Sequence, residues 1–119
     1  MRCSFWDFQN PSLSINSNSF NLNKHQSIIN FLRQLHLLNI QLDIVDYWEA
    51  DRCAIGLKKD NKLTYISTYN YINEEVIKYD YDFEIYDTAK PDTIHIVKSK
   101  TGISSIEFII EIKVFFNIL

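Results

Sequence analysis

The spacing of apolar residues changes once along this chain, and that change limits the folds open to it. Between residues 24 and 38 the apolar residues recur at i, i+3, i+4 and i+7, which places them on one face of a helix. From residue 42 onward they alternate with polar residues, as in half-buried strands. This order predicts an α+β fold: a mainly antiparallel sheet of about five or six strands with one N-terminal amphipathic helix packed on it.

The predicted helix can begin and end without glycine, of which the chain has only two. Asn21 and Asn23 are both candidates for its N-cap, and Asn39 can adopt the left-handed conformation that ends a helix. The apolar stripe of the helix comprises Ile28, Phe31, Leu32, Leu35 and Leu38.

Two further segments precede this helix. Residues 10–23 are rich in Asn and Ser and predict a partly mobile loop. Residues 3–8 predict a short edge strand.

A β-hairpin is predicted at residues 53–70, where two alternating runs flank a short polar turn. Asp60 and Asn61 tolerate the positive φ that a two-residue hairpin loop requires. Such a loop also fixes the register of the two strands. The pairs that it joins are Cys53 with Thr68, Ile55 with Ile66, and Leu57 with Thr64.

Two further strands are predicted after the hairpin. Residues 79–86 alternate aromatic or apolar side chains with acidic ones, so one face of this strand is apolar and the other mostly acidic. Residues 93–97 also alternate, and Ser99 to Gly102 then predicts a turn.

The C-terminal segment, residues 106–118, is predicted as a strand. Every even position in it is apolar, and its β-branched and aromatic content is typical of strands. A helical stripe starting at Ile106 would have to pass through Lys113 and Asn117. The exposed edge of such a strand would favour weak dimerisation, so the expected state is a monomer or a weak dimer.

Length and charge restrict the functions that the chain can have. Its 119 residues predict a single domain, residues 1–119. Fifteen acidic residues outnumber twelve basic ones, which is not the basic signature of a nucleic-acid-binding protein.

Two dispersed cysteines form no disulfide framework. The chain shows no secretory signal pattern and no apolar run that approaches about 18 residues, so a cytoplasmic protein without a membrane span is expected.

The acidic residues are unevenly distributed, and this gives the candidate binding site. Twelve of the fifteen lie between residues 43 and 92, and six tyrosines at residues 65–86 are interleaved with the acids of residues 80–87. A solvated sheet edge is one explanation, and a face that meets a basic protein partner is the other. Tyrosine is enriched where proteins bind proteins. The candidate contact residues are Glu74, Glu75, Asp80, Asp82, Glu84, Tyr86 and Asp87.

The sequence indicates no catalytic, cofactor-binding or metal-binding residue. His25, His36 and His95 are dispersed, and no spacing brings two of them together. Asp80 and Asp82 would lie about 7 Å apart on one strand face, but no glycine loop or histidine accompanies them. The Gly-x-Ser-x-Gly pattern of a nucleophilic serine is absent. A small hydrolase or ribonuclease that uses a histidine is therefore kept only as an alternative.

The central third of the chain, Asp51 to Tyr71 followed by Tyr79 to Ile85, resembles small immunity proteins of bacterial polymorphic-toxin and contact-dependent growth inhibition systems. The resemblance implies a single cytoplasmic domain that binds a cognate protein toxin domain and blocks its active site. Many such toxins are nucleases with basic clefts. The resemblance thus leads us to expect a non-enzymatic inhibitor of a basic nuclease that needs no cofactor. A phage or mobile-element inhibitor of another host protein is the second alternative.

Overall fold

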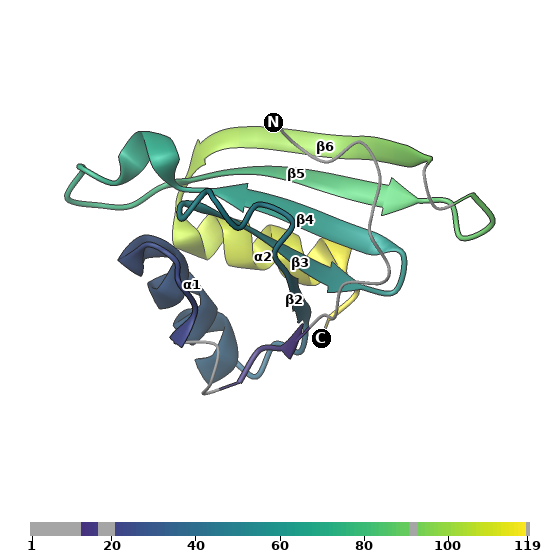
Figure 1. The fold of residues 1–119 in the computed structure, drawn as a ribbon, viewed down its shortest axis with the longest axis horizontal. Coiled ribbons are helices and arrows are strands. Elements are labelled where there is room, and N and C mark those ends of the chain that lie inside the picture. The colour runs from purple at the N-terminus through teal and green to yellow at the C-terminus, as the bar shows by residue number, and fades with distance from the viewer. Residues whose placement is uncertain (1–12, 17–20, 91–92, 119) are drawn as a thin grey trace.

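The structure is a computed structural model that describes residues 13–16, 21–90 and 93–118. In these residues it contains a six-stranded antiparallel sheet in the order β1-β2-β3-β4-β5-β6, together with two α-helices (Figure 1). The predicted α+β class and the antiparallel sheet are therefore confirmed. In chain order the elements are β1 (Leu13–Ser14), α1 (Gln26–Leu37), β2 (Asp43–Val45), β3 (Ala54–Lys59), β4 (Lys62–Ser67), the 3-10 turn η2 (Tyr69–Tyr71), β5 (Tyr79–Tyr86), β6 (Ile94–Ile103) and α2 (Ser105–Phe115).

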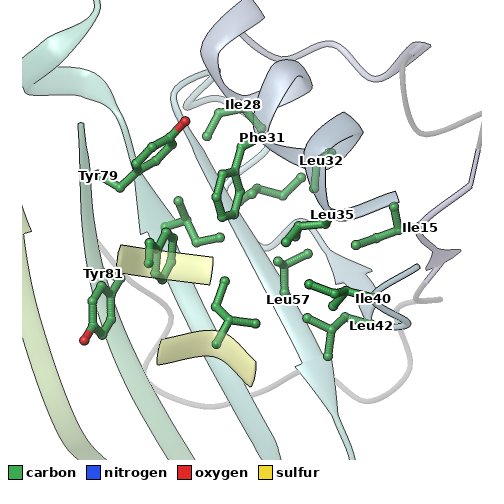
Figure 2. Close-up of a cluster of buried hydrophobic side chains, with 14 of the residues drawn as sticks. Ile15, Ile28, Phe31, Leu32, Leu35, Ile40, Leu42, Leu57, Tyr79 and Tyr81 are labelled. Carbon is green, nitrogen blue, oxygen red and sulfur yellow. The ribbon is translucent and has the colours of Figure 1, made fainter. Parts of the chain in front are cut away.

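Both helices contribute to one core on the same face of the sheet. Figure 2 shows Phe31, Leu32 and Leu35 of α1 directed toward side chains of the strands, among them Leu57 and Tyr79. Phe108 and Ile112 of α2 belong to the same cluster. The helix predicted at residues 24–38 is confirmed as α1. The expectation of a single, N-terminal helix is wrong, since α1 begins only at residue 26 and a second helix lies at the C-terminal end.

Helix α1 begins with an unusual N-cap and ends in a common C-terminal motif. Its N-cap is His25, not Asn21 or Asn23, and the Nδ1 atom of His25 accepts the backbone N–H of Ser27 at 3.0 Å. At the other end Asn39 has φ 58°, which confirms the predicted left-handed stop. The N–H of Asn39 donates to the carbonyl of His36, and the next N–H donates to the carbonyl of Leu35, which is the Schellman arrangement.

Removing the histidine cap should destabilise the protein measurably. We expect His25→Ala to lower the free energy of unfolding by about 1 kcal/mol, because the N–H of Ser27 loses its acceptor. His25→Asn should retain most of that stability, because asparagine is a favourable N-cap residue. Chemical denaturation of the three proteins measures this, and equal stabilities would show that the cap contributes nothing.

The predicted hairpin is confirmed in its turn and its register. Ile55 pairs with Ile66 and Leu57 with Thr64, and Asp60 has φ 55° in the two-residue loop. Just beyond the paired strands, the N–H of Thr68 donates to the carbonyl of Cys53 at 3.0 Å.

Strand β6 is longer than the sequence predicts, and the predicted turn at Ser99–Gly102 is wrong. The strand continues through Ser99 and Lys100, which pair with Asp82 and Tyr81 of β5. These residues are polar because β6 lies at the edge of the sheet, and edge strands commonly carry lysine and bulges. The apolar alternation that marks a strand in the sequence is therefore missing here.

The C-terminal segment is a helix, so the predicted strand at residues 106–118 is wrong. Ser104 caps α2 by accepting the N–H of Glu107 at 3.2 Å, and the Ser-x-x-Glu spacing matches a capping box. Asn117 has φ 56° and ends the helix in a second Schellman arrangement. The buried stripe consists of Phe108, Ile112 and Phe116, which avoids Lys113 and ends before Asn117.

Two predictions fall partly or wholly outside the described residues. The short edge strand at residues 3–8 lies wholly outside them. In the predicted loop at residues 10–23, the described part contains strand β1, which pairs Leu13 with Ile44 of β2.

Candidate functional site

The structure distributes the seven predicted contact residues over the whole length of β5. Glu74 and Glu75 are exposed on the connection before this strand, and Asp87 is exposed just after it. These two regions lie at opposite ends of the sheet (Figure 1). Glu84 is only 2% exposed and Tyr86 is also buried, so neither side chain offers contact area at the surface.

Asp80 is committed to an internal network. Its carboxylate accepts hydrogen bonds from the hydroxyl of Tyr71 at 2.6 Å, from the amide of Asn70 at 3.2 Å and from the N–H of Gly102 at 3.0 Å. The bond to Asp80, followed by burial and the charge of Asp80, raises the pKa of Tyr71 above its usual value. Asp80 thus holds η2 against the end of β6, and we expect it to shape this end of the sheet more than to contact a partner.

A cleft of about 710 Å³ lies beside these residues, between the β2–β3 connection and the end of β4. Its aromatic wall is built around Trp48, whose ring meets the rings of Tyr47 and Tyr65 edge to face, with centroids 5.8 Å and 4.8 Å away. Tyr69 stands at the rim and is 66% exposed. Glu49, Ala50, Asp51, Arg52 and Cys53 complete the lining.

The connection that forms the cleft is held by a buried lysine. The ammonium group of Lys24 lies 2.8 Å from the carboxylate of Asp46 and donates to the backbone carbonyls of Trp48 and Asp51. The carboxylate of Asp51 accepts the N–H of Cys53 at 2.9 Å and so fixes the last turn of the connection. The cleft is therefore preformed by bonds within the chain.

Gly56 allows Trp48 to pack against the sheet. A Cβ atom at this position would lie 2.8 Å from Cγ2 of Val45 and 3.0 Å from the Trp48 ring. Any larger residue would push the indole away from β3, so one of the two glycines of the chain is needed for the cleft wall.

Five carboxylates lie at this end of the sheet. The end of β2, the start of β3, the end of β4 and the start of β5 meet there, because neighbouring strands are antiparallel. The carboxylates are Glu49, Asp51, Glu74, Glu75 and Asp80. Among the cations on the same connections, Arg52 and Lys78 are exposed. We call these five carboxylates, together with the cleft, the acidic end.

Sequence reasoning missed the part of this site that precedes β3. The predicted contact residues do not include Trp48, Glu49 or Asp51. The one available signal was the short run Trp48-Glu-Ala-Asp51, which combines an aromatic residue with two acids just before an alternating strand.

The described histidines form no accessible catalytic arrangement. The hydroxyl of Ser27 lies 2.8 Å from Nδ1 of His25 and 2.7 Å from the hydroxyl of Thr68, but Ser27 and Thr68 are both buried. His36 and His95 are exposed on α1 and β6, respectively. Within the described ranges, no three His, Cys, Asp or Glu side chains are grouped closely enough to hold a metal ion.

Apart from the acidic end, the outer face of α2 is an apolar and exposed surface. Ile106, Ile110 and Val114 follow each other at intervals of four residues and point away from the core. Beside them, a groove of about 360 Å³ runs between α2 and β6. Its rim is charged, because Lys98 and Lys100 of β6 form ion pairs with Glu111 of α2.

Comparison with known proteins gives no relative. The chain matches no protein-family model, no curated protein and no solved structure. In the part of the chain that the structure describes, neither helix has the length and apolar character that crossing a membrane requires.

Proposed function

We propose that this chain is a non-enzymatic, cytoplasmic immunity protein that neutralises a cognate toxin domain by covering a basic, nuclease-type active-site cleft. The resemblance of residues 51–71 and 79–85 to such proteins supports this function. The acidic end supplies the surface, because its carboxylates complement a cleft built to hold nucleic-acid phosphates.

The observation that carries the proposal is that two connections place acidic side chains at the same end of the sheet. Glu49 of the β2–β3 connection and Glu75 of the β4–β5 connection, 26 residues apart in sequence, lie at the end that also carries an exposed tyrosine and an aromatic cleft. Charge gathered on one patch accelerates association with a partner of opposite charge and weakens with added salt. Aromatic side chains next to it supply the buried contact area that charge alone does not.

Growth protection tests the proposal. The chain is co-expressed with the C-terminal domain of the protein encoded immediately upstream of its gene, and survival is compared with that domain alone. We expect full protection by the wild-type chain. We also expect the double variant E49K/E75K to weaken toxin binding by roughly 100-fold or more, because like charges placed across an interface cost several kcal/mol.

The control is D87K, which reverses an exposed charge at the opposite end of β5. It should change the affinity by less than about threefold, because a reversed charge outside the contact surface is screened by salt. Failure of the wild-type chain to protect cells would reject the immunity function. Protection with equal affinities for all three proteins would reject the acidic end as the contact surface.

A further inference from the structure

We propose that the cleft beside Trp48 is a receptor for one basic side chain, arginine or lysine, presented on the backbone of the partner. This inference rests on the proposed function and names the chemistry that the acidic end recognises. The cleft, at about 710 Å³, falls within the range of typical ligand sites and has room for a long side chain together with its own backbone.

The lining provides two features that favour a cation. The ring of Trp48 is the centre of an aromatic wall, and a cation over an indole face is held by the ring quadrupole. Glu49 and Asp51 place two exposed carboxylates on the same connection. Aromatic faces combined with carboxylates are a chemistry that holds guanidinium and ammonium groups.

The indole N–H of Trp48 is a further polar group near the cleft. Nε1 is buried and has no hydrogen-bond partner among the described residues. A buried donor without an acceptor is unfavourable, so a rotation of the indole that exposes this N–H to the backbone carbonyl of a bound peptide would gain a bond that the free protein lacks.

Arg52 is the one basic residue of the lining, and it makes an acidic ligand the rival occupant. Its guanidinium group donates to the backbone carbonyl of Lys24 at 3.4 Å, so it is directed toward the segment that precedes α1. The two carboxylates and the one guanidinium group of the lining give it a net negative charge, which favours a cationic ligand.

The experiment titrates the full-length chain with four capped amino acids and follows Trp48 fluorescence. Trp6 is replaced by phenylalanine in every protein, so that Trp48 is the single indole. The probes are the N-acetyl methylamides of arginine, lysine, citrulline and glutamate. Citrulline has nearly the shape of arginine without its charge, and glutamate tests the rival.

We expect arginine or lysine to bind with a Kd of about 1 mM, and citrulline and glutamate at least tenfold more weakly. E49Q/D51N should weaken arginine binding by roughly tenfold, since each exposed ion pair contributes about a few-fold to the affinity. Asparagine at position 51 keeps an acceptor for the N–H of Cys53, so the connection should keep its fold. D87N removes one acid at the opposite end of β5, outside the cleft lining, and should leave the Kd unchanged.

Equal binding of arginine and citrulline, tighter binding of glutamate, or no effect of E49Q/D51N would overturn the basic-side-chain receptor. None of these results depends on the toxin. If the arginine probe fails while growth protection persists, the cleft inference alone is wrong. If protection fails while the probe binds, the immunity function is wrong and the cleft remains a cation site.

Discussion

Replacing Phe108 with alanine should lower the free energy of unfolding by about 3–5 kcal/mol, whereas Ile110→Ala should change it by less than about 0.5 kcal/mol. Phe108 is fully buried, and its ring stacks on Phe31 and Tyr81 with centroids 5.1 Å and 4.8 Å away. Removing it opens a cavity between α1, α2 and β5. Ile110 is 58% exposed on the outer stripe of α2 and loses little on truncation.

These two variants distinguish the helix in the structure from the strand that the alternating apolar residues predict. In a strand, residues 108 and 110 lie on the same face and would be buried together. In α2 they are two residues apart on a helix and face in different directions. Chemical denaturation gives both values, and similar losses for the two variants would contradict the helix.

Replacing the buried Lys24 with methionine should lower the free energy of unfolding by about 2–4 kcal/mol. Methionine fills much of the same space but leaves the carboxylate of Asp46 and two backbone carbonyls without the ammonium donor. Those groups hold the β2–β3 connection, so the same variant should also lose binding of the arginine probe in the cleft.

The control for this prediction is Lys78→Met, which removes an exposed lysine. It should change stability by less than about 0.5 kcal/mol, because exposed charges contribute little. Differential scanning calorimetry and denaturant titration both measure the difference. If Lys24→Met and Lys78→Met are equally stable, Lys24 does not brace the cleft.

Local signals made part of the fold predictable. The stripe of α1, the left-handed Asn39 and the turn at Asp60 depend on residues that are close in sequence. The structure confirms them except for Leu38 of the stripe, which is the C-cap and is 57% exposed. Helix α2 was missed because seven of its eleven residues are apolar and they fill every even position, so a period of two fits as readily as a helical period. The decisive signal was also local, since the capping box at Ser104 and Glu107 starts the helix.

The candidate site could be predicted only in part, because its geometry depends on long-range contacts. The acidic face of β5 is visible in the sequence, but the burial of Glu84 is set by the sheet around it. The cleft depends on Lys24, which reaches Asp46 across 22 residues, and on the close approach of Trp48 to Gly56. No periodicity records either contact.

Mapping the bound surface by NMR tests the central claim most directly. The isotope-labelled chain is titrated with the toxin domain used for growth protection, and the change in each backbone amide shift is recorded. The proposed function predicts the largest changes at residues 46–53 and 69–75, with little change along α2. Changes centred on Ile106, Ile110 and Val114, with residues 46–53 unaffected, would contradict it and assign recognition to the apolar face of α2.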